Sequence, residues 1–260
     1  PANAPIKTVY QGIKERLPHT EVIYRKGCDI IDPHFPESEV LDFPKTTEEA
    51  RLMEEAIHAA KQAEVVVMVL GGNELTVRED RSRTSLNLPG RQEELLKAVC
   101  ATGKPVVLVL LDGRASSINY AAAHVPAILH AWFPGEFCGQ AVAEALFGDY
   151  NPAGKLPVTF YRNVSQLPDF EDYNMTGRTY RYMQDVPLFP FGYGLSYTTF
   201  GYGKTVLDKN ELTAGQSLKL TVPVTNTGKR NGEEVVQVYL RKQGDAEGPI
   251  KTLRAFKRVS

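Results

Sequence analysis

The chain has 260 residues, of which 42% are hydrophobic and 23% are charged, as in ordinary globular proteins. This composition excludes a disordered chain, a collagen-like repeat and a coiled-coil rod. With 30 basic and 31 acidic residues the net charge is −1, so no overall basic field is available to bind nucleic acid or an anionic membrane. We therefore expect a small or neutral partner.

Cysteine usage and hydropathy exclude two further classes. The three cysteines, Cys28, Cys100 and Cys138, form no CxxC or Cys/His ligand spacing, so we expect neither a structural zinc site nor a disulfide framework. The longest apolar runs, at 65–70 and 106–111, are far shorter than the roughly 20 residues of a membrane-spanning helix. We expect no membrane span, no metal and no cofactor.

The first 160 residues alternate between helix and strand patterns. Thr46 and Glu49 have the spacing of a capping box, which satisfies free amides at the start of a helix. The runs at 65–70 and 106–111 are apolar at every residue, as in strands covered on both faces. In chain order, we predict helices at 6–17, 46–60, 89–98, 118–123 and 139–147, and strands at 22–24, 65–70, 106–111, 127–132 and 156–160. This order predicts an α/β domain over residues 1–160, with a mostly parallel sheet and helices on both faces.

The composition changes after residue 160. Residues 161–199 are rich in Tyr, Pro and Gly, and we expect a linker that packs on the first domain. Alternating apolar residues at 218–224, a turn at 226–228 and an apolar run at 235–240 predict two partner strands of an antiparallel sheet. A complete immunoglobulin-like sandwich takes about 100 residues. We therefore expect residues 200–260 to be part of one, and both ends of the chain to be internal positions of a longer protein.

The loop that follows Leu70 is the main candidate for a site, because open parallel sheets bind ligands beyond the carboxyl ends of their strands. Residues 71–86 contain three acids, Glu74, Glu79 and Asp80, and three arginines. They contain no G-x-G-x-x-G or GK[ST] phosphate signal, no G-x-S-x-G elbow, and no His or Cys for a metal. The pattern alone leaves two interpretations open, carboxylate chemistry and a solvated charged loop.

Six motifs occur in the order and at the spacing of a known family. They are GGNE at 71–74, RTSLNLPG at 83–90, GKPVV at 103–107, AWFPGE at 131–136, FGDYNPAGKLP at 147–157 and PFGYGLSYT at 190–198. On these motifs residues 65–154 resemble the second domain of family 3 glycoside hydrolases, in particular the bacterial β-glucosidase and β-xylosidase branch. The segment from Phe200 onward is similar to the fibronectin type III-like third domain of the same enzymes.

The resemblance implies retaining hydrolysis of a β-glycoside, in which two carboxylates about 5–5.5 Å apart act as nucleophile and acid/base. In the family the nucleophile is an Asp of a preceding (β/α)8 barrel, whose pattern this sequence lacks, and the acid/base is a Glu after a strand of the second domain. Glu79 matches that position and Glu74 is the alternative. The implied partners are an oligosaccharide or β-glycoside and the barrel, the implied location is periplasmic or secreted, and the chain alone is expected to be inactive.

Other interpretations remain open at this point. Glu79 could form a salt bridge with Arg81 or Arg83, and the chain could be a non-catalytic carbohydrate-binding or scaffold module. A nucleotide-binding α/β protein rests on fold class alone. We expect Trp132 and Phe133 to pack in the core, and residues 112–114 to form a turn with an ion pair. The sugar is not specified.

Overall fold

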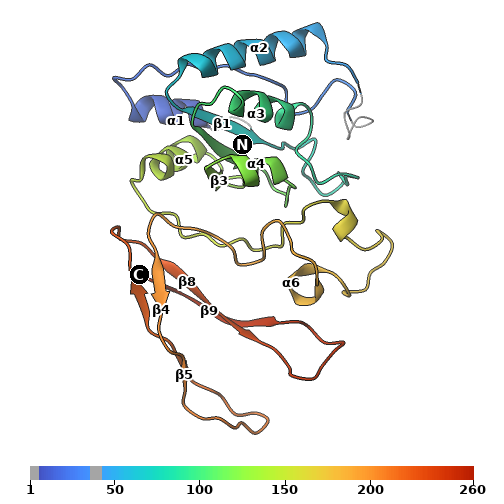
Figure 1. The fold of residues 1–260 in the computed structure, drawn as a ribbon, viewed down its shortest axis with the longest axis vertical. Coiled ribbons are helices and arrows are strands. Elements are labelled where there is room, and N and C mark those ends of the chain that lie inside the picture. The colour runs from blue at the N-terminus through green and yellow to red at the C-terminus, as the bar shows by residue number, and fades with distance from the viewer. Residues whose placement is uncertain (1–5, 36–42) are drawn as a thin grey trace.

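The computed structural model describes residues 6–35 and 43–260, and Figure 1 shows their arrangement. An α/β unit is followed by residues 161–199, for which we keep the name linker, and by pairs of antiparallel strands. The helices of the α/β unit are α1 (Val9–Arg16), α2 (Thr47–Gln62), α3 (Gln92–Cys100), α4 (Asn119–His124) and α5 (Cys138–Phe147). Its strands are β1 (Val66–Gly71), β2 (Val106–Leu111) and β3 (Ala127–His130), which pair in parallel in the order β1-β2-β3.

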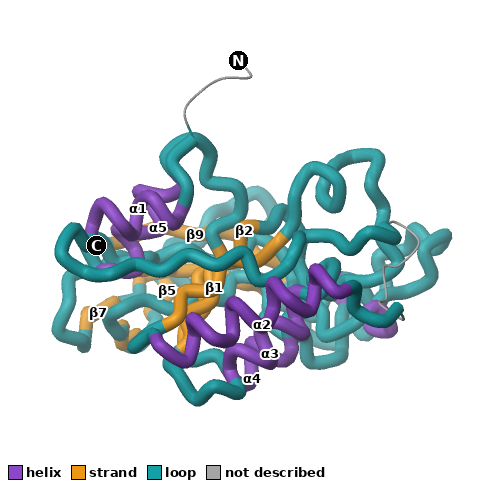
Figure 2. Tube along the Cα trace, turned by 90° about the horizontal axis from the view of Figure 1, so that it is seen from above, coloured by secondary structure: helices purple, strands orange, loops and turns teal. Residues whose placement is uncertain are grey.

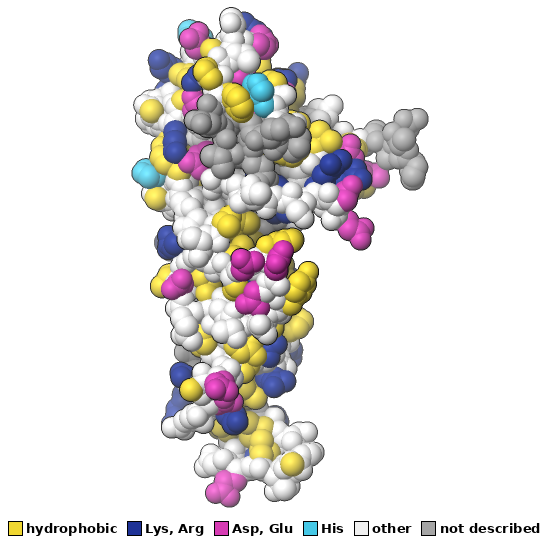
Figure 3. Space-filling view, turned by 90° about the vertical axis from the view of Figure 1, so that its right-hand side faces the viewer, with side chains coloured by type: hydrophobic (Ala, Val, Ile, Leu, Met, Phe, Trp, Pro, Cys, Tyr) yellow, Lys and Arg dark blue, Asp and Glu magenta, His cyan; other side chains and the backbone are white. Residues whose placement is uncertain are grey.

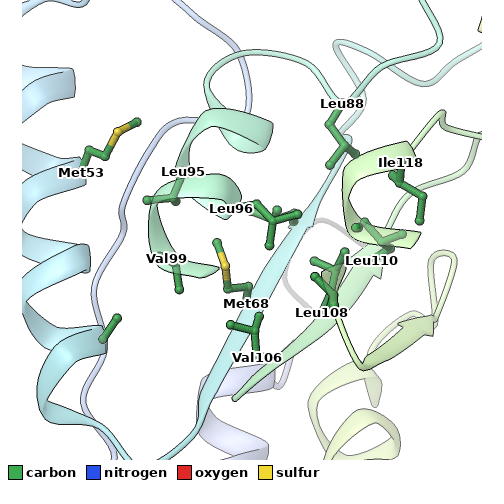
Figure 4. Packing of buried hydrophobic residues seen from close by; sticks show 14 residues of the cluster. Met53, Met68, Leu88, Leu95, Leu96, Val99, Val106, Leu108, Leu110 and Ile118 are labelled. Atoms are coloured by element: carbon green, nitrogen blue, oxygen red, sulfur yellow. The ribbon is translucent and has the colours of Figure 1, made fainter. Parts of the chain in front are cut away.

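The sheet is covered by helices on both faces, which confirms the predicted fold class (Figure 2). Side chains alternate along the central strand β2, so Leu108 and Leu110 point to one face and Val109 to the other, each at most 1% exposed. The first two pack with residues of α2, α3 and α4 (Figure 4), whereas Val109 packs with residues of α1 and α5. Because both faces of β2 are buried, the strand has no polar side chain until Asp112, the residue after its end.

The helix starts follow local chemistry. The predicted capping box of α2 is present, because the Thr46 hydroxyl accepts from the Glu49 amide and the Glu49 carboxylate accepts from the Thr46 amide. The helix predicted to start at Pro89 starts at Gln92 instead. Gly90 has a left-handed backbone (φ 61°), which is incompatible with the first turn of a helix.

Helices α1 and α5 are in direct backbone contact. A Cβ atom on Gly12 would lie 2.0 Å from the carbonyl oxygen of Gly139, and one on Gly139 would lie 2.0 Å from that of Thr8. The Gly139 amide also donates to the Lys7 carbonyl (2.9 Å). Two glycines that face each other therefore allow α1 to pack closely on α5 over the sheet.

Two predicted strands are wrong. Residues 22–24 form no strand and pair with none of the described strands, and Ile23 and Tyr24 are exposed. Residues 156–160 form no strand either. Phe160 makes an isolated antiparallel bridge with Phe189 of the linker, and the Leu156 backbone hydrogen-bonds to Gly192 and Tyr193. Phe160 is 1% exposed whereas Val158 is 42% exposed, so the apolar pattern indicated burial at Phe160 but not a paired strand.

The rest of the described chain consists of the linker and three antiparallel pairs. The linker contains η1 (Val164–Gln166) and α6 (Thr179–Tyr182). The pairs are β4 (Phe200–Tyr202) with β7 (Val224–Asn226), β5 (Val206–Leu207) with β6 (Leu220–Thr221), and β8 (Glu234–Leu240) with β9 (Thr252–Val259). The predicted pairing of 218–224 with 235–240 is therefore wrong, because each of these segments pairs with a strand outside the predicted hairpin.

The linker is joined to β8 through the 190–194 motif. Gln237 donates through Nε2 to the Gly192 carbonyl (3.0 Å). Lys155 donates to the Gly194 carbonyl (2.7 Å) and pairs with Glu234 (3.1 Å), both charged side chains being at most 15% exposed.

Figure 3 shows a face of the molecule on which hydrophobic side chains lie among acidic and basic ones.

Candidate active site

The carboxyl ends of β1, β2 and β3 lie at one edge of the sheet, because the three strands are parallel and in register. Three segments leave this edge, at 72–91, 112–118 and 131–137. The first is the loop predicted to carry the site. We call residues 72–86 the acidic loop.

The acidic loop starts with a fixed turn. Gly71 has φ 146°, and a Cβ there would lie 2.0 Å from the Leu111 carbonyl oxygen, so only glycine fits beside β2. Asn73 accepts through Oδ1 from the Leu75 amide (2.9 Å), and the Thr76 hydroxyl accepts from the Asn73 amide (3.0 Å). Thr76 is completely buried. The turn places Glu74 on its outside, where the side chain is exposed.

Gln92, in the first turn of α3, holds the end of β1. Its amide oxygen accepts from the Gly71 amide (2.7 Å), and its Nε2 donates to the carbonyls of Gly71 (2.8 Å), Pro89 (3.0 Å) and Ile30 (3.1 Å). The side chain is 2% exposed. One buried amide therefore joins the start of the strand-to-helix connection to its end.

The connection from β2 to α4 holds the acidic loop through hydrogen bonds to its backbone carbonyls. Arg114 donates through Nε to the Thr76 carbonyl (2.8 Å) and through Nη2 to the Arg81 carbonyl. The Ser117 amide donates to the Leu86 carbonyl (2.7 Å). The ion pair expected within residues 112–114 does not form between these residues, because Arg114 is directed at backbone carbonyls of the loop.

Glu79 lies in the acidic loop between the two carbonyls that Arg114 holds, and its side chain is exposed. No hydrogen bond or ion pair joins its carboxylate to another residue in the described part of the chain. The salt bridge that the charge pattern suggested for Glu79 is thus not formed there. Arg78 instead pairs with Asp80 (Nε to Oδ1, 2.6 Å). Desolvation by itself would raise the pKa of the Asp80 carboxyl, but the hydrogen bond and charge of Arg78 outweigh it, and the pKa is lowered overall.

Buried polar groups lie under the ends of β2 and β3. Asp112 is 2% exposed and accepts from the Ser116 hydroxyl through Oδ2. Its Oδ1, and both ring nitrogens of His130, have no hydrogen-bond partner among the described residues. Burial lowers the pKa of His130, and the Asp112 charge opposes this shift. The imidazole is therefore favoured in its neutral form.

The aromatic residues after β3 divide between core and surface. Trp132 is partly buried and packs on His130 (ring centroids 4.4 Å apart) and Phe160 (6.3 Å). Phe133 is 53% exposed, so its predicted place in the core is wrong. Trp132 has a left-handed backbone (φ 56°), and this turn directs the chain away from the sheet before Phe133.

Gln92 was not among the predicted site residues, although the sequence contains one usable signal for it. Gln92 precedes Leu95, Leu96 and Val99 by three, four and seven residues, and all three are buried. A polar residue on an apolar helical stripe indicates a buried hydrogen-bonding role. No comparable local pattern identifies Arg114, since its partners lie 38 and 33 residues away in sequence.

Two classes of feature are absent from the described ranges. Residues 6–35 and 43–260 contain no group of three or more His, Cys, Asp or Glu side chains that could hold a metal ion. None of the helices within these ranges is long and apolar enough to cross a membrane.

Comparison with known proteins gives consistent matches. Residues 2–197 match the model of the glycosyl hydrolase family 3 C-terminal domain. A β-xylosidase of Formosa agariphila is 43% identical over 260 residues, which cover 97% of this chain and 34% of the relative. A periplasmic β-glucosidase of Salmonella typhimurium is 38% identical over 276 residues, covering 97% of this chain and 36% of the relative. The chain thus spans about a third of the length of these relatives.

Solved structures agree with these matches. A β-glucosidase of Erythrobacter marinus superposes with a TM-score of 0.84 at 40% identity, over 98% of this chain and 36% of that one. A Listeria innocua β-glucosidase in complex with glucose superposes with a TM-score of 0.70 at 33% identity, over 83% of this chain and 31% of that one. The chain therefore belongs to glycoside hydrolase family 3, and its residues 2–197 correspond to the C-terminal domain of that family.

Proposed function

We propose that this chain supplies the general acid/base, Glu79, to the active site of a retaining β-glycoside hydrolase, and that a (β/α)8 barrel domain completes the site. The supporting observation is the placement of Glu79. Its unpaired carboxylate lies on a loop at the carboxyl edge of the sheet, and the backbone of that loop is anchored on both sides of it. A carboxylate in this position is available to a substrate held by a second domain.

The proposed reaction has two steps. First, a barrel aspartate attacks the anomeric carbon while Glu79 transfers its proton to the glycosidic oxygen, so that the C–O bond breaks and an alcohol leaves. The sugar then remains bound to the aspartate as an ester. Second, Glu79, now a carboxylate, removes a proton from water, whose oxygen attacks the anomeric carbon and releases the aspartate. Glu79 ends the cycle protonated, as it began.

Glu74 is the alternative acid/base. Both glutamates are exposed, and the family resemblance favours Glu79 by position. Glu74 lies within the turn that starts the loop, whereas Glu79 lies between the Thr76 and Arg81 carbonyls. Substituting each glutamate separately therefore tests the assignment with a matched pair.

The experiment uses the protein in which this chain follows its barrel domain. Glu79→Ala is expected to slow hydrolysis of aryl glycosides with poor leaving groups by about 10²–10⁴-fold, the usual contribution of a general acid/base. A 2,4-dinitrophenyl glycoside needs little protonation on departure, so its first step should be nearly unaffected. Added azide should restore turnover by replacing water as nucleophile. Glu74→Ala should change these rates by less than about tenfold, and the reverse pattern would assign the role to Glu74.

For the substrate, we propose a terminal, non-reducing β-linked glucose or xylose, because the relatives are named as β-glucosidases and β-xylosidases. Comparing kcat/KM for p-nitrophenyl β-glucoside and β-xyloside identifies the preferred sugar. Calorimetric titration of the chain alone with oligosaccharides tests the competing function. Tight binding without the barrel would favour a carbohydrate-binding module over half of an active site.

A further inference from the structure

The Arg114 side chain spans the segment that carries Glu79. Its Nε donates to the Thr76 carbonyl (2.8 Å) and its Nη2 to the Arg81 carbonyl. These carbonyls belong to residues on opposite sides of Glu79 in sequence. The two nitrogens lie on one edge of the planar guanidinium, so a single rigid group closes the segment 77–80 into a small ring.

The base of this clamp is itself fixed. Arg114 follows Asp112, whose buried carboxylate accepts from the Ser116 hydroxyl within the same turn. Between them, a Cβ on Gly113 would lie 2.7 Å from the Val77 side chain, so the turn and the acidic loop are in tight contact. Because the turn directly follows the buried central strand β2, the clamp fixes the loop relative to the middle of the sheet.

An ion pair with a carboxylate does not account for Arg114. It forms no ion pair with a carboxylate of the described residues, although Glu74, Glu79 and Asp80 all lie on the loop that it holds. Asp80 pairs with Arg78 instead. The hydrogen bonds of the guanidinium within the described chain are thus directed to backbone carbonyls, which is the arrangement expected of a group that fixes loop geometry.

We propose that Arg114 is a positioning residue for the acid/base: it sets the place of the Glu79 carboxylate by holding the backbone on both sides of it. This inference rests on the proposed role of Glu79. Arg114 itself need not touch the substrate. A displacement of a catalytic group by about 1 Å costs on the order of 100-fold in rate, so loss of the clamp should weaken proton transfer specifically.

The test is a leaving-group series on the protein with its barrel domain, comparing Arg114→Ala and Arg114→Lys with Glu79→Ala. For Arg114→Ala we expect about a 100-fold loss in kcat/KM on aryl glycosides with poor leaving groups, and less than about threefold on the 2,4-dinitrophenyl glycoside. Arg114→Lys keeps the charge but not the planar fork, so its loss should be intermediate. Arg258→Ala is the control: it removes an arginine of β9 from an exposed ion pair with Glu233, and it should leave the series unchanged.

The outcomes separate the two proposals. If Glu79→Ala is slow only on poor leaving groups but Arg114→Ala loses activity equally on all of them, Arg114 has a general structural role and the positioning proposal fails alone. If Glu79→Ala is fully active, both proposals fail. Hydrogen exchange of residues 77–81 gives a readout independent of turnover. These amides should exchange faster in both Arg114 variants than in Arg258→Ala, and unchanged exchange would also overturn the proposal.

Discussion

Gln92→Leu tests whether one buried amide holds the end of β1 to the start of α3. Leucine has a similar volume and a high helix propensity, so the change leaves neither a large cavity nor a weak helix. It removes the acceptor of the Gly71 amide and the donor to the Gly71, Pro89 and Ile30 carbonyls. Gln92 is 2% exposed, and its hydrogen bonds to Gly71 and Pro89 are buried.

The size of the effect follows from the groups left without partners. A buried N–H without an acceptor costs about 1–3 kcal/mol, and each ordinary hydrogen bond contributes about 0.5–1.5 kcal/mol net. Part of this loss is offset, because leucine buries apolar surface without desolvating an amide. We therefore expect the free energy of unfolding to fall by about 2–4 kcal/mol.

The assay is urea unfolding followed by the fluorescence of Trp132, the one tryptophan of the chain, which reports on the α/β unit. The control is Gln140→Leu on α5, where an exposed glutamine donates to Glu144 (2.7 Å). Its effect should stay within about 0.5 kcal/mol. If Gln92→Leu is also within that range, the hydrogen bonds of Gln92 do not hold the strand end and the reasoning is refuted.

Two further predictions concern stability. Gly12→Ala should lower the free energy of unfolding by about 1–3 kcal/mol, because the added Cβ would lie 2.0 Å from the Gly139 carbonyl oxygen. The control is Gly154→Ala, whose added Cβ has nothing within 4 Å. Equal melting temperatures of the two variants would contradict the prediction. Burial lowers the pKa of His130 in the folded protein, so the unfolded chain binds the proton more tightly. The free energy of unfolding should therefore fall as the pH drops below about 6.5, by up to about 1.4 kcal/mol per pH unit. His130→Phe should flatten that slope in urea titrations between pH 7 and 5, and an unchanged slope would exclude His130 as its source.

The parts of the fold that follow local rules were predictable from the sequence. The capping box at Thr46 and the fully apolar runs of β1 and β2 depend on neighbours in the chain, and the structure contains all three. Parallel pairing followed from the alternation of helices and strands. The strand predictions failed where a partner had to be chosen at long range. Residues 235–240 had a strand pattern, but nothing in that pattern specified Thr252–Val259 as the partner.

The same limit applies to the candidate site. The length and charge of the acidic loop were visible in the sequence, and so were Glu74 and Glu79. Its anchoring was not, because Arg114 reaches carbonyl oxygens, and every residue has one. Backbone acceptors leave no trace in residue identity. A clamp of this kind can be found only once the turn after β2 is placed beside the loop.

The contact between the linker and β8 has a consequence for how the protein is made. Gln237 donates to the Gly192 carbonyl from 45 residues further along the chain. A ribosome adds roughly 5–20 residues per second, so the 190–194 segment waits roughly 2–9 s before its partner is synthesised. During that interval Phe191 and Tyr193 lack the strand that completes their surroundings. Strand β8 is therefore synthesised after the linker segment that it contacts, so this contact cannot form until β8 has been made.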